Sequence, residues 1–153
     1  MNDSSVEEVA EVLGQVPLFK GLKRGQVRRL AERTAVRSYE PGDVIVKEGD
    51  TSMSFYVILS GSVRILRELD DHTQLDVRHS VKGGFFGEMG LIDDLPRSAT
   101  VEALDATRCA LLAKWDFQEG MRQDPDIALA LIKSLNARIR ELDSRLAGVA
   151  ATL

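Results

Sequence analysis

The spacing of apolar residues divides the chain into three parts. Residues 1–34 carry apolar positions at helical spacing, residues 35–113 alternate apolar and polar positions in short runs, and residues 114–153 return to helical spacing. A chain of 153 residues can bury one sizeable core. We therefore expect one domain with helices at its amino-terminal end, a β-rich middle and helices at its carboxy-terminal end.

The first part is expected to form two helices. Ser4 and Ser5 can cap a helix over about residues 5–13, which Gly14 and Pro17 end. A second short helix around residues 27–31 carries several Lys and Arg residues on its polar side. We interpret these charges as a solvated face, because no aromatic residues are interleaved with them. A basic patch for an acidic partner or nucleic acid is the alternative.

The middle part predicts a mainly β fold. Its short runs of alternating or continuous apolar residues are separated by turn residues such as Pro41-Gly42 and Asp70-Asp71. Roughly eight strands at this spacing are typical of a jelly-roll-like β-roll, also called a double-stranded β-helix. The clearest runs are residues 36–39, 44–46, 55–59, 63–66, 75–78, 99–103 and 108–113.

The third part begins with a short helix over residues 114–123. Its Trp115 and Phe117 are expected to pack on the β-roll. Asp124 and Pro125 then supply a helix cap followed by proline at the first helical position, which is a strong start signal. We expect the long helix that follows to reach about Gly148.

This long helix carries two apolar stripes. The main stripe alternates steps of four and three residues, as in a coiled-coil seam, and a second stripe of Ile127 and Leu131 lies near its start. We expect the second stripe to pack on the roll and the seam to form a parallel homodimer. A helix folded on its own domain is the alternative. The seam residues are Ala128, Ile132, Leu135, Ile139, Leu142, Leu146 and Val149.

Residues 85–101 have the composition of a phosphate-binding loop. Glycines at 83, 84, 87 and 90 allow close approach of the backbone to an anion, and a short helix starting near Gly87 would add its positive end. Arg97 follows Pro96 and supplies a planar fork suited to a phosphodiester. Glu88 repels phosphate, so we interpret it as an acceptor for a ligand hydroxyl group.

The same segment strongly resembles the phosphate-binding cassette of the cyclic nucleotide-binding domain family. The resemblance covers Phe86-Gly87-Glu88-Met89-Gly90-Leu91 and Pro96-Arg97-Ser98-Ala99-Thr100-Val101 without a gap. It implies that Glu88 binds the ribose 2′-hydroxyl and that Arg97 binds the cyclic phosphate. The amides of Met89, Gly90, Ser98 and Ala99 and the Ser98 hydroxyl would assist Arg97, with Phe86 and Gly87 completing the loop.

The family resemblance also bears on the base. Bacterial cyclic AMP receptors of this family often carry serine after the arginine, so Ser98 favours cyclic AMP. Its hydroxyl could also reach the amino group of guanine, so cyclic GMP is the second candidate. The family places base-contacting residues on the long helix, and Leu142 and Asp143 occupy that level here. They are not the hydroxyl residues that bacterial cyclic AMP receptors carry there, which leaves base selectivity open.

Composition excludes several other functions. The net charge of −4 argues against nucleic-acid binding by the whole surface, and no apolar run approaches the ~20 residues of a membrane span. The amino terminus lacks a signal pattern and Cys109 is the only cysteine, so we expect a cytoplasmic protein. A small metal-dependent enzyme on a double-stranded β-helix is the alternative function. It needs two or three converging histidines plus a carboxylate, whereas only His72 and His79 are present.

The expected function is therefore that of a receptor without catalytic residues, metal or cofactor. Transcriptional regulators of this family continue with a helix-turn-helix after the long helix, and only residues 146–153 remain here. We expect no direct DNA binding by this chain and an unknown effector protein as its partner. Whether it is complete or one domain of a longer chain stays open.

Overall fold

The alternating residues of the middle part form eight strands in two antiparallel sheets. The computed structural model describes residues 3–152, without the side chains of residues 3, 4, 89 and 150–152. One sheet has the order β1 (Ala35–Tyr39), β8 (Thr107–Ala113), β3 (Ser54–Ser60) and β6 (Phe85–Phe86). The other has the order β2 (Val44–Val46), β7 (Thr100–Ala103), β4 (Ser62–Glu68) and β5 (Gln74–Val81). This arrangement agrees with the expected β-roll, and β6 is a strand that the apolar pattern did not predict.

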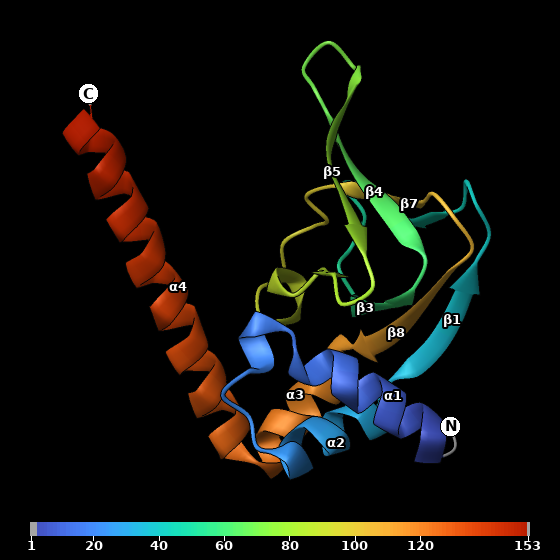
Figure 1. Cartoon of the computed structure of the whole chain (residues 1–153), viewed down its shortest axis with the longest axis vertical. Coiled ribbons are helices and arrows are strands. Elements are labelled where there is room, and N and C mark those ends of the chain that lie inside the picture. Colours follow the sequence, from blue (N-terminus) through green and yellow to red (C-terminus); the bar gives the residue numbers. More distant parts are fainter. Residues whose placement is uncertain (1–2, 153) are drawn as a thin grey trace.

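The helices lie together at one end of the roll (Figure 1). They are α1 (Asp3–Gly14), the 3-10 helix η1 (Pro17–Phe19), α2 (Arg24–Glu32), α3 (Lys114–Gln123) and α4 (Pro125–Thr152). A further 3-10 helix, η2 (Met89–Leu91), lies in the loop between β6 and β7. None of the helices in the described part of the chain is both long and apolar enough to cross a membrane.

Strand β3 separates two hydrophobic cores, because its consecutive side chains point to opposite faces of the sheet. Phe55, Val57 and Leu59 belong to the core shared with the helices, whereas Tyr56 and Ile58 belong to the core between the two sheets. All five side chains are buried. The interior of the roll and the helical base are therefore built on the same rigid strand.

The packing of α3 corrects one prediction. Phe117 is fully buried and lies 6.2 Å from the ring of Phe19, but Trp115 is 60% exposed. Residues two apart on a helix do not share a face, so only one of these aromatic residues can face the core. Phe117, with the buried Gly120 on the same side of the helix, faces the core instead of Trp115.

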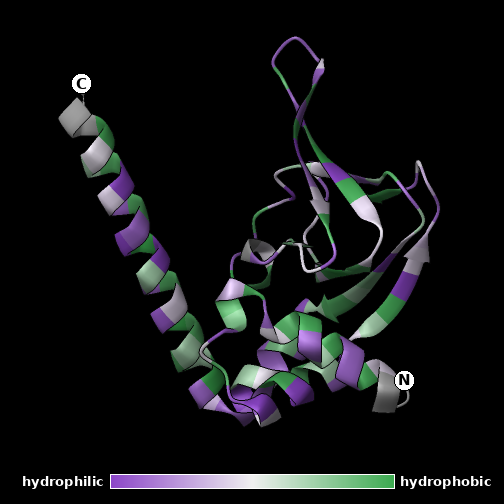
Figure 2. Ribbon diagram, in the orientation of Figure 1, coloured by the Kyte–Doolittle hydropathy of each residue, from purple (hydrophilic) through white to green (hydrophobic). Residues whose placement is uncertain are grey.

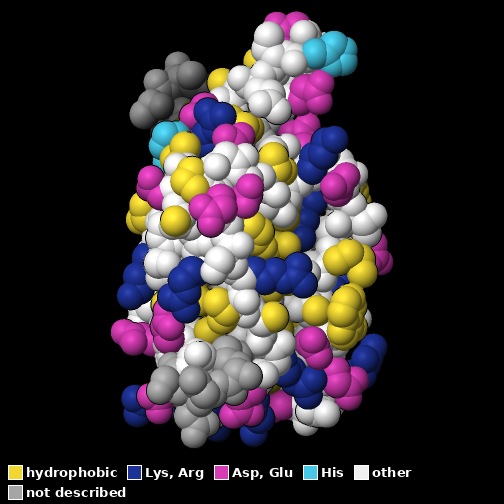
Figure 3. Space-filling model, turned by 90° about the vertical axis from the view of Figure 1, so that its right-hand side faces the viewer, with side chains coloured by type: hydrophobic (Ala, Val, Ile, Leu, Met, Phe, Trp, Pro, Cys, Tyr) yellow, Lys and Arg dark blue, Asp and Glu magenta, His cyan; other side chains and the backbone are white. Residues whose placement is uncertain are grey.

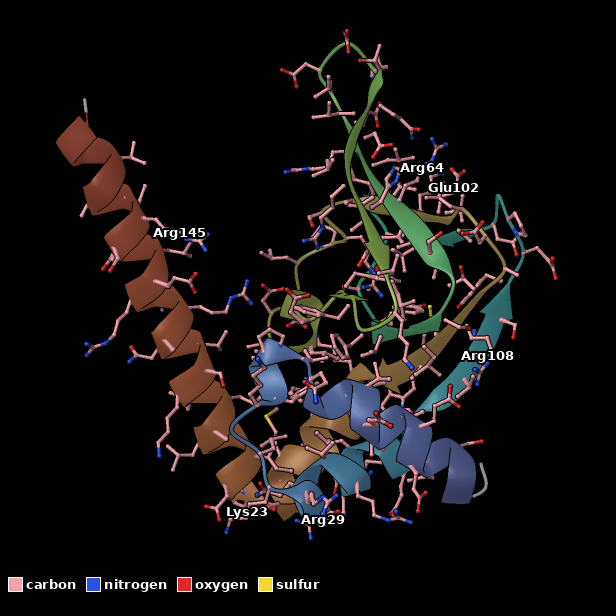
Figure 4. The ribbon with its side chains drawn as sticks, in the orientation of Figure 1. Lys23, Arg29, Arg64, Glu102, Arg108 and Arg145 are labelled. Carbon is pink, nitrogen blue, oxygen red and sulfur yellow. The ribbon has the colours of Figure 1, made fainter. Side chains whose placement is uncertain are left out.

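The two stripes of α4 behave differently. Ile127 and Leu131 are buried, as predicted, but against the helical base and not directly on the roll, whereas Ile132, Ile139 and Leu146 are 60–66% exposed. The distal half of α4 leaves the domain and carries alternating apolar and polar residues (Figures 1 and 2). Arg145 extends from this half and forms an ion pair with Glu141 of the same helix at 2.6 Å (Figure 4). The distal half of α4 is therefore exposed in this structure, and its pairing with a second copy stays a prediction.

Candidate functional site

Arg97 lies between η2 and β7 with its backbone fixed on both sides. Its N–H donates to the carbonyl of Asp50 at 2.8 Å, and its carbonyl accepts from the N–H of Gly49 at 2.9 Å. Both partners belong to the turn after β2. This clamp determines where the Arg97 side chain enters the domain, and that side chain is only 9% exposed.

One terminal nitrogen of the Arg97 guanidinium is hydrogen-bonded, and the other is not. Nη2 donates to the carbonyl of Ser54 at 2.8 Å, and Cζ lies 5.6 Å from the centroid of the Tyr56 ring. Tyr56 in turn stacks on Phe86 with ring centroids 4.8 Å apart. Nη1 is buried and has no hydrogen-bond partner within the described residues. Burial lowers the pKa of Arg97 from its usual value, which is the expected effect of removing a cation from water.

The backbone at Gly87 lies directly against Nη1 of Arg97. Its φ of +85° is left-handed, and a Cβ at this position would lie 2.3 Å from Nη1. The predicted short helix near Gly87 is present, but it begins two residues later at Met89, because Gly87 itself is left-handed. The 3-10 helix begins at Met89 and spans three residues, too few for an appreciable helix dipole.

A pocket of about 300 Å³ opens beside Arg97. Ser98 and Ala99 line it, and their backbone N–H groups make no hydrogen bond within the described part of the chain. Two free amides near a buried guanidinium can together bind an anion. The other lining residues are Val46, Ser52, Ile65, Arg78, Phe86, Gly87, Glu88, Gly90, Asp93, Leu95, Pro96 and Val101.

Glu88 lies on the rim that faces α4. Its side chain is 18% exposed, and Oε1 lies 3.9 Å from Nη1 of Arg138, an ion pair that joins the loop to the long helix. The structure thus brings Phe86, Gly87, Glu88, Gly90, Arg97, Ser98 and Ala99 to one pocket. The Met89 side chain lies outside the described residues.

Leu142 and Asp143 do not line this pocket. Leu142 is 54% exposed and lines a neighbouring apolar pocket of about 320 Å³, together with Leu18, Ile92, Leu135 and Ile139. The two pockets share Glu88 and Asp93 on their common rim. Asp143 is exposed and lines neither pocket, because α4 leaves the domain at this level. Contact of either residue with a base stays a prediction that requires α4 to move.

Arg78 on β5 was missed from the sequence. It lines the same pocket as Arg97, and its exposed side chain makes no ion pair or hydrogen bond within the described residues. The alternation of β5 gives no signal for it, because the register of the β4–β5 pair shifts between Ile65 and Leu66 and leaves Val77 without a partner. The place of Arg78 could be known only from the pairing of β5 with β4.

The other candidate residues have ordinary structural roles. His72 and His79 bond to Glu68 and Asp76 at 2.8 and 3.0 Å, and no group of metal-ligating residues occurs in the described part of the chain. A histidine marks the tip of the projecting β4–β5 hairpin in Figure 3, which also shows acidic and basic side chains interspersed. Cys109 is fully buried, and burial raises the pKa of its thiol to about 12.

The basic helix α2 is largely neutralised by acidic neighbours. Arg29 (Figure 4) forms an ion pair with Asp124 at 2.8 Å, and Arg33 forms one with Asp116 at 3.5 Å. These contacts join α2 to α3 and to the start of α4. They favour the interpretation of this helix as an ordinary charged surface.

Comparisons with known proteins agree with this geometry. A sequence model described as the cyclic nucleotide-binding domain matches residues 36–124. The regulatory subunit of cAMP-dependent protein kinase from Candida albicans is 38% identical over 108 residues, covering 71% of this chain and 23% of that protein. The chain spans about a quarter of the length of the kinase regulatory subunits that it matches.

Two solved structures are also similar to the whole arrangement. The N-terminal domain of a transcriptional regulator from Streptomyces coelicolor A3(2) matches with a TM-score of 0.81 and 28% identity, over 87% of this chain and 95% of that one. The catabolite activator protein of Thermus thermophilus matches with a TM-score of 0.73 and 31% identity, over 88% of this chain and 63% of that one.

Proposed function

Because the chain belongs to the cyclic nucleotide-binding domain family, we propose that it is a non-catalytic receptor for a 3′,5′-cyclic mononucleotide. The main support for the proposal is Nη1 of Arg97, which is buried and has no hydrogen-bond partner within the described residues. It lies beside a pocket lined by Ser98 and Ala99, whose backbone N–H groups are also free within these residues. A buried donor without a partner is costly, and a phosphodiester oxygen would satisfy it.

Glu88 is proposed to bind the ribose 2′-hydroxyl. It lines the pocket with Arg97, and its carboxylate accepts no hydrogen bond from a neutral donor within the described residues, so this group has acceptor capacity to offer. A double-mutant cycle tests this role with wild type and Glu88→Gln against cyclic AMP and 2′-deoxy cyclic AMP. Removing the hydroxyl should weaken binding to wild type, and the same removal should matter much less in Glu88→Gln. Equal losses in both proteins would contradict the assignment.

Cyclic AMP is the first candidate ligand and cyclic GMP the second. Relatives more than 30% identical are named as regulatory subunits of cAMP-dependent kinases, which supports adenine. Ser98, at the pocket wall, offers a hydroxyl that either base can use.

The contact between Glu88 and Arg138 gives α4 a route to sense the ligand. A ribose hydroxyl that binds Glu88 alters the partners of this carboxylate, and Arg138 lies on the helix. We propose that ligand binding shifts α4 by changing this contact and the apolar pocket beside it. The repositioned helix then signals to an effector protein.

The exposed seam of α4 supports a parallel homodimer. Ile132, Ile139, Leu142 and Leu146 are each more than half exposed, and they recur at coiled-coil spacing on one side of the helix. Replacing Leu135 and Leu142 with glutamate should yield monomers, because pairing would then bury charge across the seam.

Sedimentation with and without nucleotide measures this effect. The matched control carries glutamate at Ala137 and Ser144, which add the same charge away from the seam. A monomeric wild type under both conditions would exclude the dimer.

Calorimetric titration of the wild-type protein with cyclic AMP, cyclic GMP and 5′-AMP tests the function itself. Both cyclic nucleotides should bind, and 5′-AMP should bind more weakly, because its phosphate carries an extra charge and is not held against the ribose. Absence of binding to any cyclic mononucleotide would contradict the proposal.

A further inference from the structure

Lys114 lies at the junction where strand β8 ends and helix α3 begins. Its backbone N–H donates to the carbonyl of Met53 at 2.9 Å. The next carbonyl along the chain, that of Ser54, accepts from Nη2 of Arg97 at 2.8 Å. Lys114 and Arg97 are therefore anchored on adjacent carbonyl groups at the start of β3.

The side chain of Lys114 contacts the loop that leads to Arg97. Its Nζ donates to the carbonyl of Asp93 at 2.7 Å and to Oδ1 of Asp94 at 2.5 Å. The Lys114 side chain is only 12% exposed, whereas that of Asp94 is 95% exposed. An ion pair with so exposed a carboxylate contributes little, because water and salt screen it. The charge-assisted bond to the Asp93 carbonyl, which is partly buried, is therefore the stronger of the two contacts.

The loop between η2 and Arg97 has few other attachments. Oδ1 of Asp93 accepts from the N–H of Leu95 at 3.0 Å, which closes a turn within the loop itself. Within the described residues, the bonds of Lys114 alone join residues 93–96 to the rest of the domain by hydrogen bond or ion pair. Asp93, Leu95 and Pro96 line the pocket, so the conformation of this loop shapes the anion site.

We propose that Lys114 is a positioning residue for the anion site, an inference that rests on the proposed function. Its ammonium fixes the turn at Asp93, and this turn leads into Arg97 and the two free amides that follow it. Without the ammonium, the loop has other conformations open to it. Only the fraction of molecules with the ordered loop then binds phosphate tightly, and the apparent affinity falls by that fraction.

Calorimetry with cyclic AMP and cyclic GMP on folded variants tests the proposal. Lys114→Met removes the ammonium and keeps most of the apolar stem, whereas Lys114→Arg keeps a charged donor. Asp94→Asn removes only the exposed half of the contact. Lys20→Met is the matched control, because it removes an exposed lysine that does not line the pocket.

Lys114→Met should weaken both cyclic nucleotides by the same factor, roughly ten- to a hundredfold, because the base takes no part in this contact. Asp94→Asn should weaken them by at most about fivefold. Lys114→Arg should recover part of the loss, and Lys20→Met should match wild type. In an Arg97→Lys background, Lys114→Met should weaken binding by a clearly smaller factor, because Lys114 acts through the placement of Arg97. Unchanged affinity of a folded Lys114→Met variant, or the same loss in both backgrounds, would overturn the proposal.

Hydrogen exchange of the free protein tests the same contact without nucleotide. The amides of Leu95 and Arg97, which are hydrogen-bonded in the structure, should exchange faster in Lys114→Met than in wild type and in Lys20→Met. Unchanged exchange at both amides would overturn the proposal. Faster exchange in a protein that binds no cyclic mononucleotide would instead refute the proposed function, and with it the role of Lys114 in binding.

Discussion

Comparing Gly87→Ala with a second glycine variant separates the energetic cost of backbone strain from the effect of displacing the Arg97 side chain. Placing alanine at a φ of +85° costs about 1–2 kcal/mol, because the left-handed region crowds the new Cβ. Here the Cβ would also lie 2.3 Å from Nη1 of Arg97 and 2.9 Å from the Ser54 carbonyl. The guanidinium must therefore shift away from the partner that orients it.

Gly42→Ala is the matched control, because Gly42 has a φ of +91° and open space around the new Cβ. Gly42→Ala should lose about 1–2 kcal/mol of unfolding free energy in urea titrations, and Gly87→Ala should lose at least as much, because its Cβ also meets the Ser54 carbonyl. Only Gly87→Ala should also weaken cyclic nucleotide binding, by about ten- to hundredfold if the charge-assisted contact of ~1.5–3 kcal/mol is lost. Equal nucleotide affinities for the two variants, measured by calorimetry, would refute this description of the pocket.

Three further predictions concern the surroundings of the site. Tyr56→Leu should weaken nucleotide binding about 2- to 30-fold in calorimetry, because the cation–π contact that positions Arg97 is worth ~0.5–2 kcal/mol. Phe117→Ala should lower the unfolding free energy by about 3–5 kcal/mol, whereas Trp115→Ala should change it by less than ~0.5 kcal/mol in the same urea titration. The Gln26 side-chain amide, together with Arg29, lowers the pKa of Asp124. The ionised Asp124 carboxylate therefore stabilises the fold at pH values above the pKa that Asp124 has in the unfolded chain. The stability difference between wild type and Asp124→Asn should thus shrink as the pH falls below about 4.

The sequence predicted that Gly87, Glu88 and Arg97 meet at one pocket because that segment is local. Gly87, Glu88 and Arg97 lie within eleven consecutive positions, and their spacing alone indicates an anion loop. The helix starts and the buried stripe at Ile127 and Leu131 were also predictable, since helical periodicity repeats over many residues. Strand β6 was missed because two residues carry no periodicity.

The remaining parts depend on contacts between distant segments. Arg78 belongs to the pocket only because β5 pairs with β4, and residues 13 positions apart, Ile65 and Arg78, meet across that ladder. Leu142 and Asp143 do not line the pocket beside Arg97, because α4 leaves the helical base in another direction. Trp115 and Phe117 were equally apolar in sequence, and only the orientation of α3 decides which one is buried.

The affinity of cyclic AMP for wild type and for Arg97→Ala, measured by calorimetry, tests most directly whether this pocket is a cyclic nucleotide site. Thermal unfolding of the variant first establishes that it is folded, and Arg97→Lys, which keeps the charge without the fork, accompanies it. We expect Arg97→Ala to bind about ten- to more than a hundredfold more weakly, and Arg97→Lys to be intermediate. A folded Arg97→Ala variant that binds cyclic AMP as tightly as wild type would contradict the assignment of the pocket.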